Sequence, residues 1–288
     1  MGLPYGLAPF LVRGGQTESD VGERLRLTIP AATRGYCDAQ LDDYRSMPRR
    51  SFPWRPPLAF RVRARSSVRE PLGTLGFGFW NDPFAMGIGE AGARRLLPSP
   101  PQTLWFFYAS PQSDLRFSPA GPGNGWNAIA LRSPSIPDPI FTMLGAGALG
   151  LLLLPALRRL PFQVFYRTSH VAMAPIPAGL DRWHEYGIDW EAGEARFLVD
   201  GETVLIAPHP PHGPLGLVLW IDNQFAVASP ARGFRFGASP VGHAQSLELE
   251  GIRVDASTGG APHRPITPTS RSSLPTNPRR EEHPAVDR

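Results

Sequence analysis

The chain has 288 residues, of which 42% are hydrophobic, enough to bury the core of one large domain or of two ordinary ones. Its 34 prolines and 30 glycines exclude long helical bundles and favour short strands joined by turns. The single cysteine, Cys37, excludes an internal disulfide, and the net charge of +4 rests on arginine because the sequence contains no lysine.

The two ends of the chain differ in composition from its middle. Residues 1–20 predict an irregular arm without a basic start or an unbroken apolar run, so we expect no secretory signal and a protein at a membrane or in the cytoplasm. Beyond residue 256 the chain is rich in Ser, Thr, Pro and Arg, which predicts a disordered tail over 256–288. The folded domain is expected over residues 21–255.

Short apolar segments separated by Pro and Gly turns run through this domain and predict an all-β fold, an antiparallel β-sandwich. Residues 183–201 alternate twice around a Gly-containing turn, which predicts a hairpin with one buried face. The predicted strands span residues 25–29, the start of 37–44, 58–65, 73–80, 104–110, 125–132, 183–190, 197–199, 204–206, 215–223 and 246–254.

Arginine alternates with small apolar residues in the predicted strand 58–65. Arg61, Arg63 and Arg65 therefore share one face of that strand. No aromatic residue is interleaved with them, as binding of single-stranded nucleic acid would require. We interpret this face as the solvated side of an outer sheet and expect no nucleic-acid partner.

The predicted strand 73–80 has glycine at two successive positions of one face. Gly76 and Gly78 leave a bare strip beside Trp80, since no side chain projects there. Such a strip suits a flat ligand, and it suits close packing by a neighbouring loop equally well.

One segment does not fit a sandwich. Asp138 can cap a helix that begins at Pro139, and residues 140–157 carry no charge. A helix of that length reaches roughly 27 Å, just short of a hydrocarbon core of about 30 Å. It could lie in the membrane interface, pack on the protein, or span a bilayer if the strands on its two sides do not share one domain.

Of these three readings we favour a membrane-inserted element, because a helix that is apolar all round prefers lipid or full burial. The apolar helical insertion is predicted over residues 139–161. The residues expected to enter the lipid are Ile140, Phe141, Leu144, Leu151, Leu152, Leu153 and Leu154.

The predicted hairpin carries a specific pattern, Trp-His-Glu-Tyr-Gly-Ile-Asp-Trp over residues 183–190 and Phe-Leu-Val-Asp-Gly over residues 197–201. It resembles the hairpin of the family-16 glycoside hydrolases, which are laminarinase- and lichenase-type enzymes of the concanavalin A-like lectin/glucanase superfamily. The final strand 247–254 and the strand ending in Phe79 and Trp80 are similar to strands of that family. The resemblance covers residues 21–255 apart from the insertion and implies a concanavalin A-like jelly roll.

The resemblance also implies a catalytic strand with the motif Glu-x-Asp-x-Glu, whose glutamates act as nucleophile and acid/base. By order along the chain, that strand is 104–110, which contains no acidic residue. We therefore predict no catalytic residue, and a glycoside hydrolase if the chain is an enzyme. Other neighbouring acids are interpreted as exposed carboxylates: Asp42, Asp43, Asp189, Glu191, Glu248 and Glu250.

No cofactor is expected. The seven histidines are scattered, without the spacing of a zinc site, and no phosphate-binding loop or nucleophile elbow is present. The sequence predicts neither a metal site nor a bound cofactor.

Aromatic residues beside amides and carboxylates mark where a sugar could bind on the concave face. Trp220, Asp222 and Gln224 share one strand face and form the favoured set, whereas each tryptophan alone is more simply a core residue. The candidate carbohydrate-binding residues are Trp80, Asn81, Asp82, Trp126, Asn127, Trp220, Asp222 and Gln224.

The sequence thus predicts a non-catalytic carbohydrate-binding module held at a membrane by residues 139–161, with carbohydrate and lipid as partners. A glycoside hydrolase acting on β-glucans with relocated carboxylates is the first alternative. A structural or protein-interaction sandwich is the second.

Overall fold

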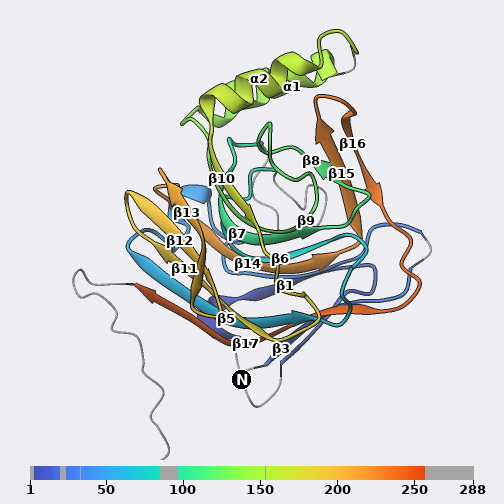
Figure 1. Cartoon of the computed structure of the whole chain (residues 1–288), viewed down its shortest axis with the longest axis vertical. Helices are drawn as coiled ribbons and strands as arrows, with labels where there is room; N and C mark the ends of the chain where they lie inside the picture. The colour runs from blue at the N-terminus through green and yellow to red at the C-terminus, as the bar shows by residue number, and fades with distance from the viewer. Residues whose placement is uncertain (1–2, 20–23, 33, 85–96, 153, 257–288) are drawn as a thin grey trace, which may run out of the picture. The chain divides into compact units, whose positions relative to one another are not determined.

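The computed structural model describes residues 3–19, 24–32, 34–84, 97–152 and 154–256. Two seven-stranded sheets, A and B, face each other, and a small three-stranded sheet and two helices lie on the side of sheet A that faces away from sheet B (Figure 1). Every neighbouring pair of strands in sheets A and B is antiparallel. The described part of the chain is therefore an antiparallel β-sandwich. The predicted tail lies outside the described residues.

Each sheet draws its strands from distant parts of the sequence. In spatial order, sheet A contains β1 (Ala8–Val12), β4 (Asp38–Asp42), β14 (Gly216–Asp222), β6 (Thr74–Trp80), β7 (Gln102–Ala109), β9 (Gly125–Arg132) and β10 (His170–Pro175). Sheet B contains β13 (Glu202–Pro208), β12 (Glu194–Val199), β11 (His184–Trp190), β5 (Leu58–Ser66), β17 (Gln245–Ala256), β3 (Leu25–Ile29) and β2 (Gln16–Ser19). The small sheet contains β16 (Gly233–Ala238), β15 (Gln224–Ser229) and β8 (Asp114–Leu115).

The main core lies between sheets A and B and is rich in aromatic rings. Phe77 and Phe106 of sheet A meet Tyr186 of sheet B with ring centroids 5.1 and 5.0 Å apart, and Phe106 also meets Phe197 at 5.3 Å. All four side chains are at most 1% exposed. Because rings from both sheets interlock, the two sheets share one core.

The hairpin predicted over residues 183–201 is confirmed. Strands β11 and β12 pair with Tyr186 opposite Val199 and Trp190 opposite Ala195. Asp200 and Gly201 then take positive φ angles of 51° and 82°, as a two-residue turn of the mirror-image type requires, and lead into β13.

The prediction of an irregular arm over residues 1–20 is wrong for residues 8–12 and 16–19, which form β1 and β2. Strand β1 pairs with β4 at the edge of sheet A, and β2 pairs with β3 in sheet B. Pro9 is tolerated in β1 because β1 is an edge strand.

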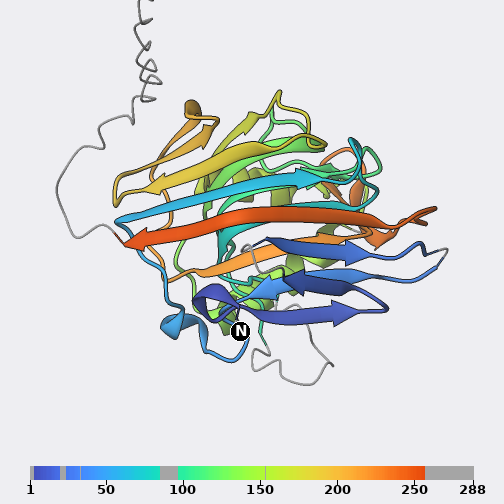
Figure 2. The ribbon, with the colours of Figure 1, turned by 90° about the horizontal axis from the view of Figure 1, so that it is seen from below.

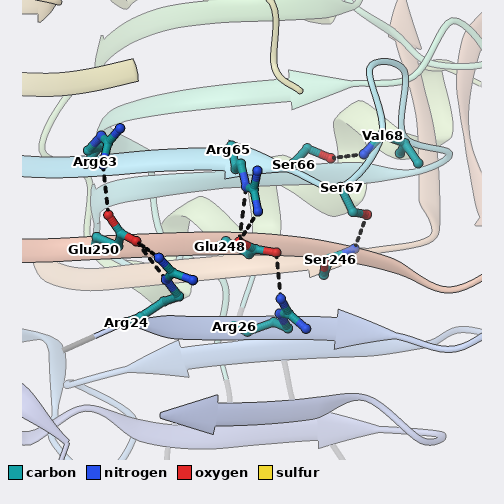
Figure 3. Close-up of polar contacts among 10 residues, drawn as sticks. All are labelled: Arg24, Arg26, Arg63, Arg65, Ser66, Ser67, Val68, Ser246, Glu248 and Glu250. Atoms are coloured by element: carbon teal, nitrogen blue, oxygen red, sulfur yellow. Dashed lines mark hydrogen bonds and ion pairs between the residues drawn. The ribbon is translucent and has the colours of Figure 1, made fainter. Parts of the chain in front are cut away.

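The outer face of sheet B carries the alternating arginines. Figure 2 shows the long strand β17 between β5 and β3. Two glutamates on β17 are flanked by two arginines on β5, one on β3 and one just before β3 (Figure 3). These residues are Glu248, Glu250, Arg63, Arg65, Arg26 and Arg24. Glu248 is 4% exposed and accepts hydrogen bonds from both Arg26 and Arg65 at 2.9 Å. The two glutamates therefore pair with all four arginines and offset half of their positive charge within the sheet. The interpretation of Glu248 as an exposed carboxylate is wrong.

The segment predicted as a single apolar insertion over residues 139–161 forms two shorter helices, α1 (Asp138–Leu152) and α2 (Arg159–Thr168). The intervening turn contains Pro155, which has no N–H to continue the helical ladder. Among the described residues, no helix has the length and hydropathy needed to cross a bilayer. Leu153 lies outside the described residues.

Candidate functional site

The face of sheet A that points away from sheet B carries the glycine strip. An added Cβ at Gly76 would lie 2.5 Å from the Trp220 ring, and one at Gly78 would lie 2.3 Å from the Leu104 carbonyl oxygen and 3.0 Å from Cβ of Trp105. Neighbouring tryptophans of the same sheet therefore fill the strip, so neither a flat ligand nor a packed loop is needed to explain the glycines.

These tryptophans belong to a second apolar cluster on this face, which we call the outer aromatic cluster: Tyr44, Phe52, Trp80, Trp105, Phe107 and Trp220. The Trp105 ring lies 5.4 Å from Trp80 and 5.5 Å from both Phe107 and Trp220. Both Trp80 and Trp220 are 8% exposed, and Met47, Leu115, Phe117 and Met173 pack against the cluster. The rings are thus packed as a second core.

Three aspartates lie beside this cluster on strands β4 and β14. Asp38 stands opposite Asp222 in the ladder, and Asp42 lies two pleats away on β4. Oδ1 of Asp222 accepts hydrogen bonds from the Thr74 backbone N–H at 3.0 Å and hydroxyl at 2.9 Å, while Asp42 forms an ion pair with Arg45 at 2.6 Å. All three side chains are buried.

Burial raises the pKa of Asp222 to about 7 and holds the pKa of Asp38 well above its usual range, an effect that the charge of Asp222 reinforces. Oδ1 of Asp38 is buried and has no hydrogen-bond partner among the described residues. The pair of carboxyls therefore still holds a proton as the pH approaches neutrality.

Sequence reasoning singled out Asp222 as a candidate binding residue but missed the acids beside it. It treated Asp42 and Asp43 as exposed, whereas they are 1% and 8% exposed, and it did not single out Asp38. Asp43 accepts hydrogen bonds from the Leu217 N–H at 2.9 Å and the Trp54 indole at 2.5 Å, and burial raises its pKa to about 7. Only the pairing of β4 with β14, strands far apart in sequence, reveals that these acids are enclosed.

The predicted sugar-binding residues separate into groups. Trp220 and Asp222 lie on the outer face of sheet A, on the one strand face that their parity predicted, and Trp80 lies on the same face at the other end of the β6–β14 ladder from Asp222. Asn127 lies on the same face but is 1% exposed, and its Nδ2 donates to the carbonyls of Asn124 and Gly125. Trp126, next to it, points into the core between the sheets, so it was wrongly placed among residues of the concave face.

The remaining three predicted residues have structural partners. Asn81 donates to the Pro100 carbonyl at 2.8 Å and accepts from the Gln102 N–H at 3.0 Å, and the Asp82 carbonyl accepts from Arg49 at 2.6 Å. Gln224 begins β15 in the small sheet, because the chain leaves sheet A after Asp222. The predicted alternation of Trp220, Asp222 and Gln224 on one strand is thus interrupted.

An open cleft of about 1010 Å³ lies where β6 ends, β7 begins, β9 ends and β10 begins. Its polar lining includes Arg49, Arg50, Gln102, Arg132, His170 and His212. Arg49 forms an ion pair with Asp138 at 2.8 Å, whereas Arg50 and Arg132 have no side-chain hydrogen bond or ion pair within the described part of the chain. The cleft therefore has a mixed lining, with Pro48, Leu97, Pro134 and Leu215 beside the polar residues, and Arg50 and Arg132 add positive charge that no described residue pairs. Of the predicted residues, Asn81 lines it.

Within the described residues, no three side chains of His, Cys, Asp or Glu are grouped so that they could hold a metal ion. The chemistry available in the cleft is hydrogen bonding and charge attraction from guanidinium, imidazole and amide groups.

No protein-family model matches the chain, and no curated protein matches it. Among solved structures it is similar to a glycoside hydrolase family protein from Mycobacterium thermorestibile, with 14% identity, a TM-score of 0.44 and coverage of 88% of this chain and 93% of that chain. It is also similar to a pseudo beta-1,3-glucanase of Mycobacterium tuberculosis, with 13% identity, a TM-score of 0.41 and coverage of 83% and 77%.

A legume lectin-like domain from Entamoeba histolytica is similar at 7% identity and a TM-score of 0.42, with coverage of 87% of this chain and 89% of that domain. The chain also matches a sialidase, of which it spans only 17%. These neighbours include glycoside hydrolase-like and lectin-like proteins, but similarity at this level assigns no family and no activity. The class, an antiparallel β-sandwich, rests on the strand order of the chain itself.

Proposed function

We propose that the chain is a carbohydrate-binding β-sandwich of the concanavalin A-like class, and that its ligand binds in the cleft at the end of sheet A. The observation that carries the proposal is the cleft itself, which is open, has donor and acceptor groups among apolar residues, and is large enough for a short saccharide at about 1010 Å³. The outer aromatic cluster is a less suitable place, because Trp80 and Trp220 are packed and 8% exposed.

The lining of the cleft suits a ligand with many hydroxyl groups. Arg132 offers a planar fork of donors that no described residue occupies, and exposed His170 and His212 add ring nitrogens that can donate or accept. The excess of Arg50 and Arg132 over acids favours saccharides that carry a carboxylate or sulfate group, because a guanidinium binds such oxyanions in a bidentate manner.

The test is a glycan array with the full chain, followed by titration of any bound saccharide. Arg132→Gln should weaken binding roughly tenfold or more, since one charge-assisted contact is worth about 1.5–3 kcal/mol. Arg253→Gln is the matched control, because Arg253 is an exposed, unpaired arginine on β17 among the described residues. Binding that survives Arg132→Gln but is lost in folded Trp220→Ala would place the ligand at the aromatic cluster instead. No glycan signal at all would end the proposal.

A second candidate, a glycoside hydrolase with relocated carboxylates, is favoured by one observation. Asp38 and Asp222 are adjacent carboxyls with raised pKa values, and glycosidases need one carboxyl that stays protonated. Turnover of β-1,3- or β-1,4-glucans that is lost in Asp222→Asn would establish this candidate. Wild-type protein without turnover would exclude it for these substrates.

A further inference from the structure

Exposed apolar side chains gather on α1, α2, the turn between them and β16. Ten large apolar residues there are at least 38% exposed, and we call them the apolar surface: Ile140, Met143, Leu144, Leu149, Leu154, Leu157, Leu160, Val164, Phe234 and Phe236. The two helices pack on each other, and α1 also lies against β16 (Figure 1). A Cβ added at Gly233 would lie 3.8 Å from the carbonyl oxygen of Leu152, so the end of α1 and the start of β16 are neighbours.

No described residue of either helix is buried, although α1 carries no charge after Asp138. Added Cβ atoms at Gly145, Gly147 and Gly150 would meet no atom within 4 Å, so α1 is uncovered by other described parts of the protein at these three positions, which lie on different sides of the helix. A helix that is apolar all round is normally buried in protein or lipid, and a large exposed apolar patch marks an interaction surface. A partner of matching chemistry is therefore expected to cover it.

The charges around the apolar surface are positive and unpaired. Five arginines on the helices, in their connecting turn and at β16 have no side-chain ion pair or hydrogen bond with another described residue: Arg158, Arg159, Arg167, Arg232 and Arg235. The arginines at the centre of sheet B are different, because Arg63 and Arg65 pair with Glu250 and Glu248. Asp138, the acid at the start of α1, is already paired with Arg49.

This charge pattern favours an anionic bilayer over a second copy of the chain. Two copies that meet through the same surface would bring their arginine rims together, and like charges oppose such an interface. Anionic headgroups would instead pair with the arginines while the acyl region receives the apolar side chains, and each basic residue near such a surface strengthens the attraction.

The second helix supplies the polar face that the first one lacks. Arg159, Gln163 and Arg167 recur every four residues along α2 and are exposed, and they form a polar stripe beside Leu160 and Val164. A helix pair with one apolar and one basic side is the pattern of an element that lies in the plane of the membrane interface.

We infer that the apolar surface of α1, α2 and β16 docks on the surface of an anionic lipid bilayer, with the helices in the plane of the interface. The inference goes beyond carbohydrate binding and does not depend on it. It also differs from the predicted membrane-inserted single helix, because two shorter helices lie at the interface and neither needs membrane-spanning length.

The experiment is co-sedimentation of the full chain with vesicles of phosphatidylcholine alone and of phosphatidylcholine mixed with phosphatidylglycerol. We expect stronger binding to the mixed vesicles, weakened by salt because part of the attraction is electrostatic. The double variant Met143→Glu, Val164→Glu should lower the partition coefficient roughly tenfold or more. Arg158→Gln with Arg159→Gln should remove most of the preference for the anionic lipid.

The matched control is Ile206→Glu, because Ile206 is 52% exposed on β13 at the edge of sheet B. It should bind vesicles like the wild type, and circular dichroism should show that all variants are folded. A wild-type chain that sediments with neither vesicle would overturn the inference. So would equal loss in the control, or a stable dimer in solution that the Met143→Glu, Val164→Glu variant dissociates.

Discussion

Replacing Asp222 with asparagine should change the free energy of unfolding relative to the wild type in a pH-dependent way. The advantage of the variant should be larger at alkaline pH than at acidic pH. Asp222 is 5% exposed, and burial raises its pKa from 3.8 to about 7. The folded state therefore binds this proton more tightly than the unfolded state. The carboxyl carries no penalty below about pH 4, lowers stability as the pH rises toward about 7, and carries its full penalty above that.

The size of the effect follows from the shift. About three pKa units at about 1.36 kcal/mol each give a penalty of up to about 4 kcal/mol above pH 7. Asparagine keeps an oxygen that can accept from the Thr74 and Gln224 N–H groups, which donate to Asp222 at 3.0 and 2.9 Å. The advantage of Asp222→Asn over the wild type should therefore grow by about 3 kcal/mol between about pH 5 and about pH 8.

Urea unfolding followed by tryptophan fluorescence at the two pH values measures this difference. Asp189→Asn is the control, since Asp189 is a partly exposed carboxylate paired with Arg61 and should show no such growth. If Asp222→Asn changes the free energy of unfolding equally at both pH values, Asp222 is ionised in the folded state and the reasoning fails.

Three further changes test the sandwich itself. Phe77→Ala should cost about 3–5 kcal/mol of unfolding free energy in chemical denaturation, because it empties the centre of the inter-sheet core; a cost under about 1 kcal/mol would contradict that position. Gly78→Ala should lower Tm by several degrees, since φ of Gly78 is 141° and the new Cβ would lie 2.3 Å from the Leu104 carbonyl oxygen. Gly193→Ala is the control and should change Tm little, because its new Cβ would have no atom within 4 Å. Glu248→Gln should cost about 1–3 kcal/mol, because it weakens charge-assisted bonds from Arg26 and Arg65 to a buried acceptor, and high salt should not abolish the cost.

The parts of the fold that could be predicted from sequence are those with local signals. Tyr186, Ile188 and Trp190 alternate with polar residues and precede a short turn, so the hairpin follows from residues that are close in sequence. At strand β9 the alternation does not tell which residues face the main core, because sheet A is covered on both faces. There Trp126 enters the main core while Asn127 faces the outer cluster. Parity separates the residues into two sets, but it does not assign either set to the inner or the outer face of the sheet.

The candidate site had no local signal. Arg50, Arg132 and His212 come together in the cleft from segments far apart in the sequence. Likewise, Asp38 reaches Asp222 only through the pairing of β4 with β14. Such juxtapositions depend on strand order, which composition and periodicity do not specify.

The cleft and the helix pair have residues in common: Asp138, the first residue of α1, and Thr168, the last residue of α2, are part of the cleft wall. Anything that shifts these helices also reshapes the wall, and a ligand seated against the wall restrains the helices in return. Occupancy of the two surfaces is then thermodynamically reciprocal, so a factor by which lipid changes the affinity for a saccharide must equal the factor by which that saccharide changes the affinity for lipid.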